Sequence, residues 1–101
     1  MEVFLSELAE QKLKKLNDYL LEKSSYEVKK DFLAKLTAKI EHIALFPESC
    51  QKSTSFGGIF KCVVTKQTTF FYRVNIAREK IEIIMVFDTS RYPNKLNQQL
   101  D

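Results

Sequence analysis

The sequence predicts an α+β fold in which an N-terminal strand and an α-helical hairpin pack on a curled antiparallel sheet, in the order β-α-α-β-β-β. Two stretches repeat apolar residues with helical spacing and are joined by a very short link. Three runs rich in β-branched and aromatic residues follow, with connections too short for parallel neighbours. We expect the 101 residues to form a single domain over residues 1–101.

The chain begins with a short apolar segment, residues 1–5, which is compatible with an edge strand. Ser6 is expected to cap the helix that follows, and Glu7 lies in the first turn, where a negative charge suits the helix dipole. This helix is expected to run for about 18 residues. Its apolar residues fall on one face: Ala9, Leu13, Leu16 and Leu20.

A second helix is predicted to begin at the segment "SSYE". Ser24 and Glu27 have the spacing of a capping box, and Pro47 should end the helix because it cannot continue it. So short a link between the helices favours an antiparallel hairpin. The apolar stripe of this helix comprises Phe32, Leu33, Leu36, Ile40 and Ile43.

A polar loop over residues 48–58 separates the helices from the strands. It ends in Gly57-Gly58, a pair that favours a turn over a phosphate-binding loop, since no Lys-Ser/Thr pair or helix follows. The three predicted strands occupy residues 59–65, 69–76 and 80–87.

The last of these strands has the composition of a central strand, because both of its faces are largely apolar. Simple alternation places one set of side chains on one face and the remainder on the other. The first set is Ile81, Ile83, Met85 and Phe87, and the second is Glu82, Ile84 and Val86.

The composition is that of an ordinary globular chain, with 45% hydrophobic and 29% charged residues. The apolar runs are too short to cross a bilayer and no signal-peptide pattern follows Met1, so we expect a cytoplasmic protein with no membrane partner. Cys50, Cys62 and His42 do not supply a zinc ligand set, and neither a metal nor a cofactor is expected. The two thiols are interpreted as reduced and mostly structural.

Basic charge is concentrated in the second half of the chain. Residues 1–50 hold eight Lys and nine acids, whereas residues 51–101 hold eight Lys or Arg and four acids. An anionic partner, either nucleic acid or an acidic protein segment, is consistent with this excess.

The predicted last strand ends in a cluster of polar residues, "DTSRY". Asp88 and Thr89 are expected to hold the chain's exit through side-chain hydrogen bonds. For Arg91 two interpretations stand: a simple ion pair, or a clamp for phosphate or carboxylate, which the planar guanidinium suits.

Two further basic residues lie within the predicted strands. Arg73 shares a strand face with Phe71 and Asn75, opposite the face of Phe70, Tyr72 and Val74. It either contacts a nucleic-acid strand beside an aromatic ring or covers the core with its stem. Lys61 on the neighbouring strand adds to the same basic region. No hydrolytic triad or carboxylate pair is evident, and His42 lies off the apolar stripe of its helix.

The helical hairpin, the segment "GGIFKCVVTKQTTFFYRV" and the segment "KIEIIMVFDTSRYPNKL" together resemble the RelE/ParE superfamily of toxins from bacterial type II toxin–antitoxin modules. The closing "FDTSRYPNKL" is similar to the ending common among plasmid-stabilisation toxins. The resemblance implies a RelE/ParE-like fold and a toxin that a cognate antitoxin holds inactive in a hetero-oligomer. The second half of the chain has more aromatic residues than so small a domain can easily cover, and we expect Phe70, Phe71, Tyr72 and Tyr92 to contribute to binding.

The resemblance leaves two targets open. RelE-like members cleave messenger RNA on the ribosome without a metal, using basic residues on the sheet and after the last strand; here Arg91, Lys61 and Arg73 are the nearest matches. ParE-like members instead inhibit DNA gyrase without chemistry of their own. No tyrosine or histidine follows in "NKLNQQLD", and a ribonuclease with this set would lack an acid, so the sequence favours the gyrase inhibitor.

Overall fold

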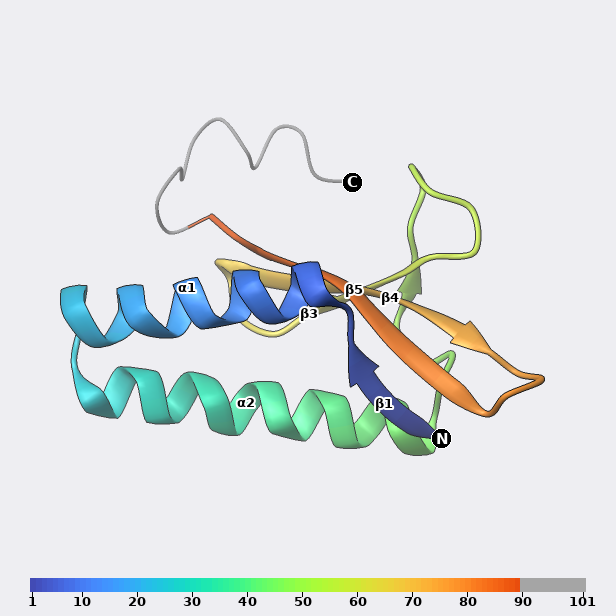
Figure 1. Ribbon diagram of the computed structural model, residues 1–101, viewed down its shortest axis with the longest axis horizontal. Helices are drawn as coiled ribbons and strands as arrows, with labels where there is room; N and C mark the ends of the chain where they lie inside the picture. Colours follow the sequence, from blue (N-terminus) through green and yellow to red (C-terminus); the bar gives the residue numbers. More distant parts are fainter. Residues whose placement is uncertain (90–101) are drawn as a thin grey trace.

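The computed structural model describes residues 1–89 and has the predicted elements in the predicted order, with one further strand of two residues inside the segment predicted as a loop (Figure 1). Helices α1 (Glu7–Lys23) and α2 (Tyr26–Leu45) run antiparallel on one side of a sheet. Within these residues the sheet has five strands in the order β1-β5-β4-β3-β2. The α+β prediction is therefore confirmed. The strands are β1 (Glu2–Leu5), β2 (Gln51–Lys52), β3 (Phe60–Val63), β4 (Thr68–Asn75) and β5 (Lys80–Asp88).

The sheet is mixed rather than wholly antiparallel. The pairs β2–β3, β3–β4 and β4–β5 are antiparallel, as their short connections require. The predicted edge strand β1 instead pairs with β5 in parallel, with Val3 opposite Ile81. The helical hairpin and three strands separate β1 from β5 along the chain, so no short connection restricts their direction.

Both helices begin at a serine cap. Ser6 caps α1 as predicted, its Oγ accepting a hydrogen bond from the Ala9 N–H at 3.0 Å. The predicted capping box at Ser24 is wrong by one residue, because α1 continues to Lys23 and Ser24 closes it with an N–H bond to the Leu20 carbonyl. Ser25 caps α2 by accepting from the Val28 N–H at 3.2 Å.

The hydrophobic core lies between the helix pair and the face of the sheet that the helices cover. Strand β4 contributes the two largest fully buried side chains, Phe70 and Tyr72. The predicted helix stripes are confirmed, since each of their residues is either buried in this core or packed against it. The buried members from the helices are Ala9, Leu16, Phe32, Leu36 and Ile43, and those from β5 are Ile81, Ile83 and Val86.

A β-bulge in β5 changes which of its residues face the core. Phe71 is opposite Met85 and Tyr72 is opposite Ile83, so Ile84 is an extra residue with no partner on β4. The bulge reverses the alternation, and Val86 joins Ile81 and Ile83 in the core. The prediction that Met85 and Phe87 share a face with Ile81 and Ile83 is therefore wrong.

The bulge is held by the start of α1. The Ser6 N–H donates to the Ile83 carbonyl at 2.9 Å, and the Ser6 hydroxyl donates to the Ile84 carbonyl at 3.0 Å. One serine thus caps α1 and binds the carbonyl of the extra residue. This arrangement joins the end of β1, the first turn of α1 and the middle of β5.

Local contacts account for the polar loop and for the end of β5. Gly58 has φ +74°, a left-handed conformation that favours glycine, in agreement with the predicted turn. At the end of β5, the Thr68 hydroxyl donates to the Asp88 carboxylate, and the Thr89 N–H donates to the Gln67 carbonyl at 2.8 Å. Asp88 and Thr89 therefore hold the exit of the strand as predicted, against the β3–β4 turn.

Candidate functional site

The sheet has one face turned away from the helices, which we call the open face. Cross-strand pairs place Lys61, Phe71 and Met85 in one row across β3, β4 and β5. The next row contains Arg73, Glu82 and Phe4, from β4, β5 and β1. The open face therefore combines charged and apolar side chains from four strands, and β2 adds Gln51, opposite Lys61.

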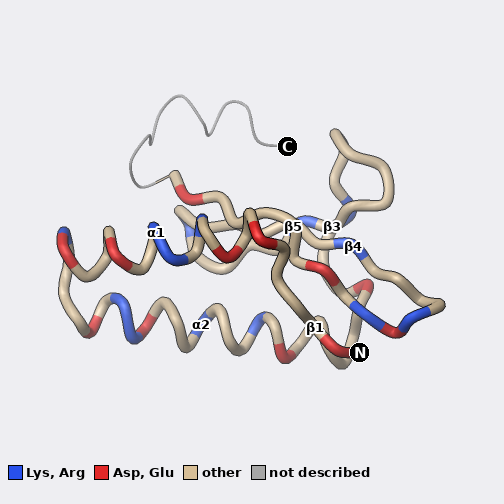
Figure 2. The backbone as a smooth tube through the Cα atoms, in the orientation of Figure 1, with Lys and Arg blue, Asp and Glu red and all other residues tan. Residues whose placement is uncertain are grey.

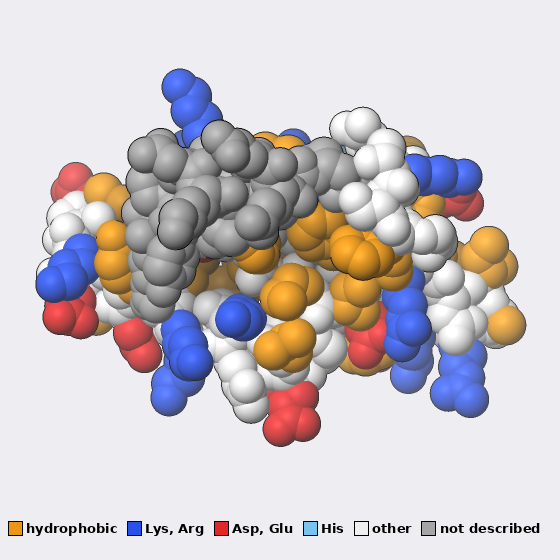
Figure 3. All heavy atoms as spheres, turned by 90° about the horizontal axis from the view of Figure 1, so that it is seen from above, with side chains coloured by type: hydrophobic (Ala, Val, Ile, Leu, Met, Phe, Trp, Pro, Cys, Tyr) orange, Lys and Arg blue, Asp and Glu red, His pale blue; other side chains and the backbone are white. Residues whose placement is uncertain are grey.

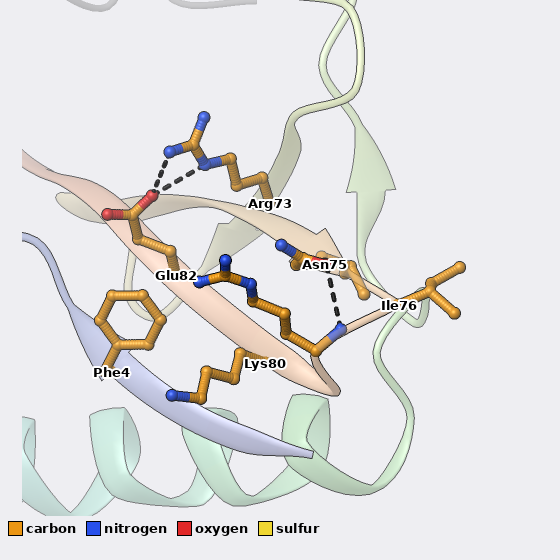
Figure 4. Close-up of a pocket in the computed structure, with 8 residues that line it drawn as sticks. Phe4, Arg73, Asn75, Ile76, Lys80 and Glu82 are labelled. Atoms are coloured by element: carbon orange, nitrogen blue, oxygen red, sulfur yellow. Dashed lines mark hydrogen bonds and ion pairs between the residues drawn. The ribbon is translucent and has the colours of Figure 1, made fainter.

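An ion pair connects β4 and β5 on this face. Glu82 Oε1 accepts from Arg73 Nε at 2.7 Å and lies 2.6 Å from Arg73 Nη2 (Figure 4). The Arg73 side chain is 63% exposed and the Glu82 side chain 21% exposed. The outward surface of the Arg73 side chain is therefore accessible to a partner, whereas the Glu82 carboxylate neutralises much of the arginine's charge.

A hollow of about 690 Å³ lies beside this ion pair, at the end of the open face nearest the β4–β5 turn. Figure 4 shows the Phe4 ring and the Lys80 side chain on one side of it and the Arg73–Glu82 pair on the other. The Asn75 side chain holds the adjoining turn, its Oδ1 accepting from the Arg78 N–H at 3.2 Å. The lining residues are Phe4, Arg73, Val74, Asn75, Ile76, Arg78, Lys80 and Glu82.

The lining of the hollow is net positive. It contains three basic side chains, those of Arg73, Arg78 and Lys80, and one acid, Glu82. Lys80 has a long contact of 3.8 Å with Glu2, and Arg78 makes no ion pair with any residue of the described part of the chain. Basic and acidic positions alternate near the β4–β5 turn in Figure 2, and Lys and Arg side chains project from this end in Figure 3. The arrangement suits a partner that combines acidic with apolar groups.

The structure brings two of the sequence-predicted basic residues onto one surface. Lys61 is half-buried opposite Phe71, and Arg73 is the next residue along the same face of β4. Phe71 is on this face as predicted, but only 7% of it is exposed. Arg91 and Tyr92, the other predicted site residues after the last strand, lie outside the described residues.

The two remaining predicted binding residues belong to the core. Phe70 and Tyr72 are fully buried on the helix-covered face, and the Tyr72 hydroxyl donates to the Pro47 carbonyl at 2.8 Å. Phe60 stacks on the Tyr72 ring, with centroids 5.2 Å apart. Neither side chain is therefore exposed on a surface that a partner can reach without opening the core.

The open face of residues 1–89 carries neither a histidine nor a tyrosine. The chain's one histidine, His42, is exposed on α2 and packs beside the Phe46 ring, with centroids 5.1 Å apart. Tyr72 is in the core, and Tyr19 and Tyr26 are on the helices. Within this part of the chain, the face offers cations, apolar contacts and the carboxylate of Glu82.

Sequence reasoning did not identify Arg78, Lys80 and Phe4 as site residues. Phe4 and Lys80 come from the first and last strands, and only the parallel β1–β5 pairing brings these strands together. Arg78 lies in the β4–β5 turn, where a charged residue is ordinarily solvated. The alternation of β1 was a usable signal, since it places Phe4 on the face opposite Val3 and Leu5.

Two features are absent from residues 1–89. None of the helices in this range has the length and apolar character needed to cross a bilayer. The same range contains no group of three or more His, Cys, Asp or Glu side chains arranged to hold a metal ion.

The fold is similar to that of solved structures described as toxins or as a toxin–antitoxin system. The chain is similar to a structure of the chromosomal ParDE toxin–antitoxin system from P. aeruginosa, with a TM-score of 0.71 and 11% identity over 87% of this chain and 95% of that one. It is similar to the YoeB/ParE toxin from Agrobacterium tumefaciens, with a TM-score of 0.62 and 14% identity over 87% and 98%. The isolated E. coli RelE toxin gives a TM-score of 0.60 and 14% identity over 98% of both chains.

These likenesses place the fold among RelE- and ParE-like toxins. A family model described as "ParE toxin of type II toxin-antitoxin system, parDE" matches residues 3–93, nearly the whole chain. The chain therefore belongs to the ParE toxin family of type II toxin–antitoxin systems. A sequence search of curated proteins finds no match.

Proposed function

We propose that this toxin acts on DNA gyrase by binding it, without catalysis of its own, and that a cognate antitoxin neutralises it. The observation that carries the proposal is the composition of the open face within residues 1–89, where no tyrosine or histidine accompanies Lys61 and Arg73. RNA cleavage through the 2′-hydroxyl requires proton transfer at two oxygens, and the Glu82 carboxylate of this face is already bound to Arg73.

The ion pair between Arg73 and Glu82 also supports a toxin that binds its target without catalysis. A guanidinium that stabilises a developing phosphate charge works best when its own charge is uncompensated. Arg73 instead has two of its nitrogens within 2.7 Å of Glu82 Oε1. An arginine paired in this way still contributes its planar surface and remaining donors to a protein interface.

The antitoxin contact is proposed from the apolar surface of the helices and loops. Several large apolar side chains are more than half exposed, including Leu45 at 75% and Phe46 at 57%, next to one another at the end of α2. An antitoxin segment that folds as it binds gains most by covering such residues. The other large apolar side chains of this kind, each more than half exposed, are Tyr26, Phe56, Val63 and Ile76.

The alternative function is a RelE-like, ribosome-dependent endoribonuclease with an atypical site. The observation in its favour is that Lys61 and Arg73 lie on the same open face, close to one another in the strand register. In that case Arg91 would complete the set of basic residues, as the resemblance implies.

A paired assay distinguishes the two functions. The purified chain is added to gyrase with relaxed plasmid, and separately to ribosomes translating a defined message. We expect inhibited supercoiling or trapped cleaved plasmid, and intact messages. Codon-phased cuts in the message that disappear with Arg91→Ala, alongside unaffected gyrase, would overturn the proposal in favour of the endoribonuclease.

Variants test whether the open face makes the contact. Arg73→Ala should weaken gyrase inhibition by on the order of tenfold, the value of one charge-assisted contact. Lys30→Ala is the matched control, since it removes an exposed positive charge from α2, on the helix side of the molecule. Equal inhibition by both variants would show that the target contact lies elsewhere.

A further inference from the structure

Two free cysteines lie opposite one another across β2 and β3. Gln51 pairs with Lys61 in the antiparallel register, so the residue before Gln51, Cys50, is opposite the residue after Lys61, Cys62. The Ser53 N–H donates to the Ile59 carbonyl at 2.8 Å, which makes Ser53 and Ile59 a hydrogen-bonded pair. By the alternation of an antiparallel ladder, Cys50 and Cys62 occupy a non-hydrogen-bonded position, where side chains approach most closely.

The contacts of the two thiols agree with this register. Together with burial, Cys50 helps to raise the pKa of both Cys62 and Tyr72, which agrees with a Cys50 thiol beside these two groups. The Tyr72 hydroxyl is itself fixed by its bond to the Pro47 carbonyl. Opposed residues at such positions have the Cα separation that a disulfide bond requires. The two sulfur atoms therefore need little backbone movement to bond.

The two thiols differ in access and in chemistry. Cys50 is partly exposed, whereas Cys62 is only 2% exposed. Burial, with the hydrogen bond to Cys50, raises the pKa of Cys62 to about 12, against the opposing effect of the Lys39 charge. Cys62 is therefore a protonated thiol at neutral pH, and an oxidant from solvent meets Cys50 first.

We propose that Cys50 and Cys62 form a modifiable dithiol, which hydrogen peroxide converts into an intramolecular disulfide between Cys50, just before β2, and Cys62 of β3. In the first step the Cys50 sulfur attacks the peroxide; an S–O bond forms, the O–O bond breaks and one water leaves. In the second step the Cys62 sulfur attacks the resulting sulfenic acid; the S–S bond forms, the S–O bond breaks and the Cys62 proton leaves in a second water. The two sulfurs together lose two electrons, and the peroxide gains them.

The disulfide restrains the pairing of β2 with β3, the strand that places Lys61 on the open face. It closes a loop of about a dozen residues, which contains Phe56 and Gly58, and restricts the unfolded chain accordingly. It also fixes the strand position next to Lys61, because Cys62 follows Lys61 in β3. The inference does not depend on whether the toxin acts on gyrase.

The test uses the full chain, reduced and then treated with hydrogen peroxide in slight excess. We expect a monomer that has lost two hydrogen atoms by intact mass, no thiols left for alkylation, and a peptide map joining Cys50 to Cys62. Dithiothreitol should reverse the change. The Tm should rise by roughly 5–15 °C on oxidation, as expected for a loop of this length in a domain of this size.

Two variants check the order of the steps. Cys62→Ala should trap a dimedone-reactive sulfenic acid at Cys50, and Cys50→Ser should leave Cys62 unreacted at the same peroxide concentration. Sulfinic acid at Cys50 of the unmodified sequence, with Cys62 still alkylatable, would overturn the proposal. Disulfide-linked dimers through Cys50 would overturn it equally, and this result requires no variant to fold.

Discussion

The two faces of strand β4 differ in burial and in charge. Phe70 and Tyr72 point toward the helices and are fully buried, whereas Arg73, the next residue, is exposed on the open face with its partner Glu82. Packing accounts for the residues of the covered face, since each fills a defined space between sheet and helices. Packing does not require Arg73 and Lys61 on the open face. Exposed basic residues without a packing role are typical of a surface that binds a partner.

Truncation of the covered face should have the largest effect. Phe70→Ala removes a ring from a fully buried site and should lower the free energy of unfolding by about 3–5 kcal/mol. Arg73→Ala on the open face should change it by less than about 1 kcal/mol. Urea denaturation of both variants measures the contrast. Similar losses from the two substitutions would mean that the open face is also a packing surface.

High pH should lower the stability of the fold through two groups on the covered face, Cys62 and Tyr72. Burial and contact with Cys50 raise the pKa of Tyr72, and the pKa of Cys62 rises to about 12. Both groups stay protonated in the folded chain while the unfolded chain releases their protons, so their contribution is complete below about pH 9 and is lost as the pH rises. The loss is at most about 1.4 kcal/mol per pH unit for each group.

Thermal unfolding between pH 8 and pH 11 tests this expectation. Tyr72→Phe should reduce the slope of stability against pH, whereas Tyr26→Phe, on an exposed ring at the start of α2, should leave it unchanged. A slope that is identical in both variants would assign the alkaline transition to other groups.

Substitution of Ser6, the serine that holds the bulge, should have an intermediate effect on the free energy of unfolding. Ser6→Ala removes the cap of α1 and the hydrogen bond to the Ile84 carbonyl, and should cost about 1–2 kcal/mol. Ser25→Ala, which removes only the exposed cap of α2, should cost about 1 kcal/mol or less. Chemical denaturation gives both values. A larger loss at Ser25 would contradict the role assigned to the bulge.

The ion pair of the open face should contribute least to stability. Glu82→Gln leaves Arg73 without its carboxylate, but the arginine is 63% exposed and the change should stay within about 1 kcal/mol. The substitution should instead alter partner binding, because it raises the positive charge of the hollow. Calorimetry with an acidic peptide as a probe, against Lys30→Ala, would measure this. Unchanged binding would exclude the hollow as an electrostatic site.

The helices were predictable because their signal is local. Spacings of three and four identified the stripe from Ala9 to Leu20, and Pro47 marked the end of the hairpin. Ser24 was mistaken for the cap of α2 because the adjacent serines offer the same chemistry, and only the length of α1 distinguishes them.

The strand pairing was less predictable because it depends on distant residues. The alternation of β5 was read without the bulge at Ile84, so Val86 was assigned to the wrong face. Strand β2 has only two residues, both polar, so no apolar alternation in the sequence predicts it. For the candidate site, Lys61 and Arg73 were found from their strands, whereas Phe4 and Lys80 required the parallel β1–β5 pair.

That parallel pair has a consequence for synthesis of the toxin. Strand β1 is made before its partner β5, so β1 remains unpaired while the two helices and the three strands between them are made. The hollow, which takes Phe4 from one strand and Lys80 from the other, cannot assemble on a nascent chain. A ribosome making this toxin therefore holds a chain without its complete open face until translation has passed the final strand.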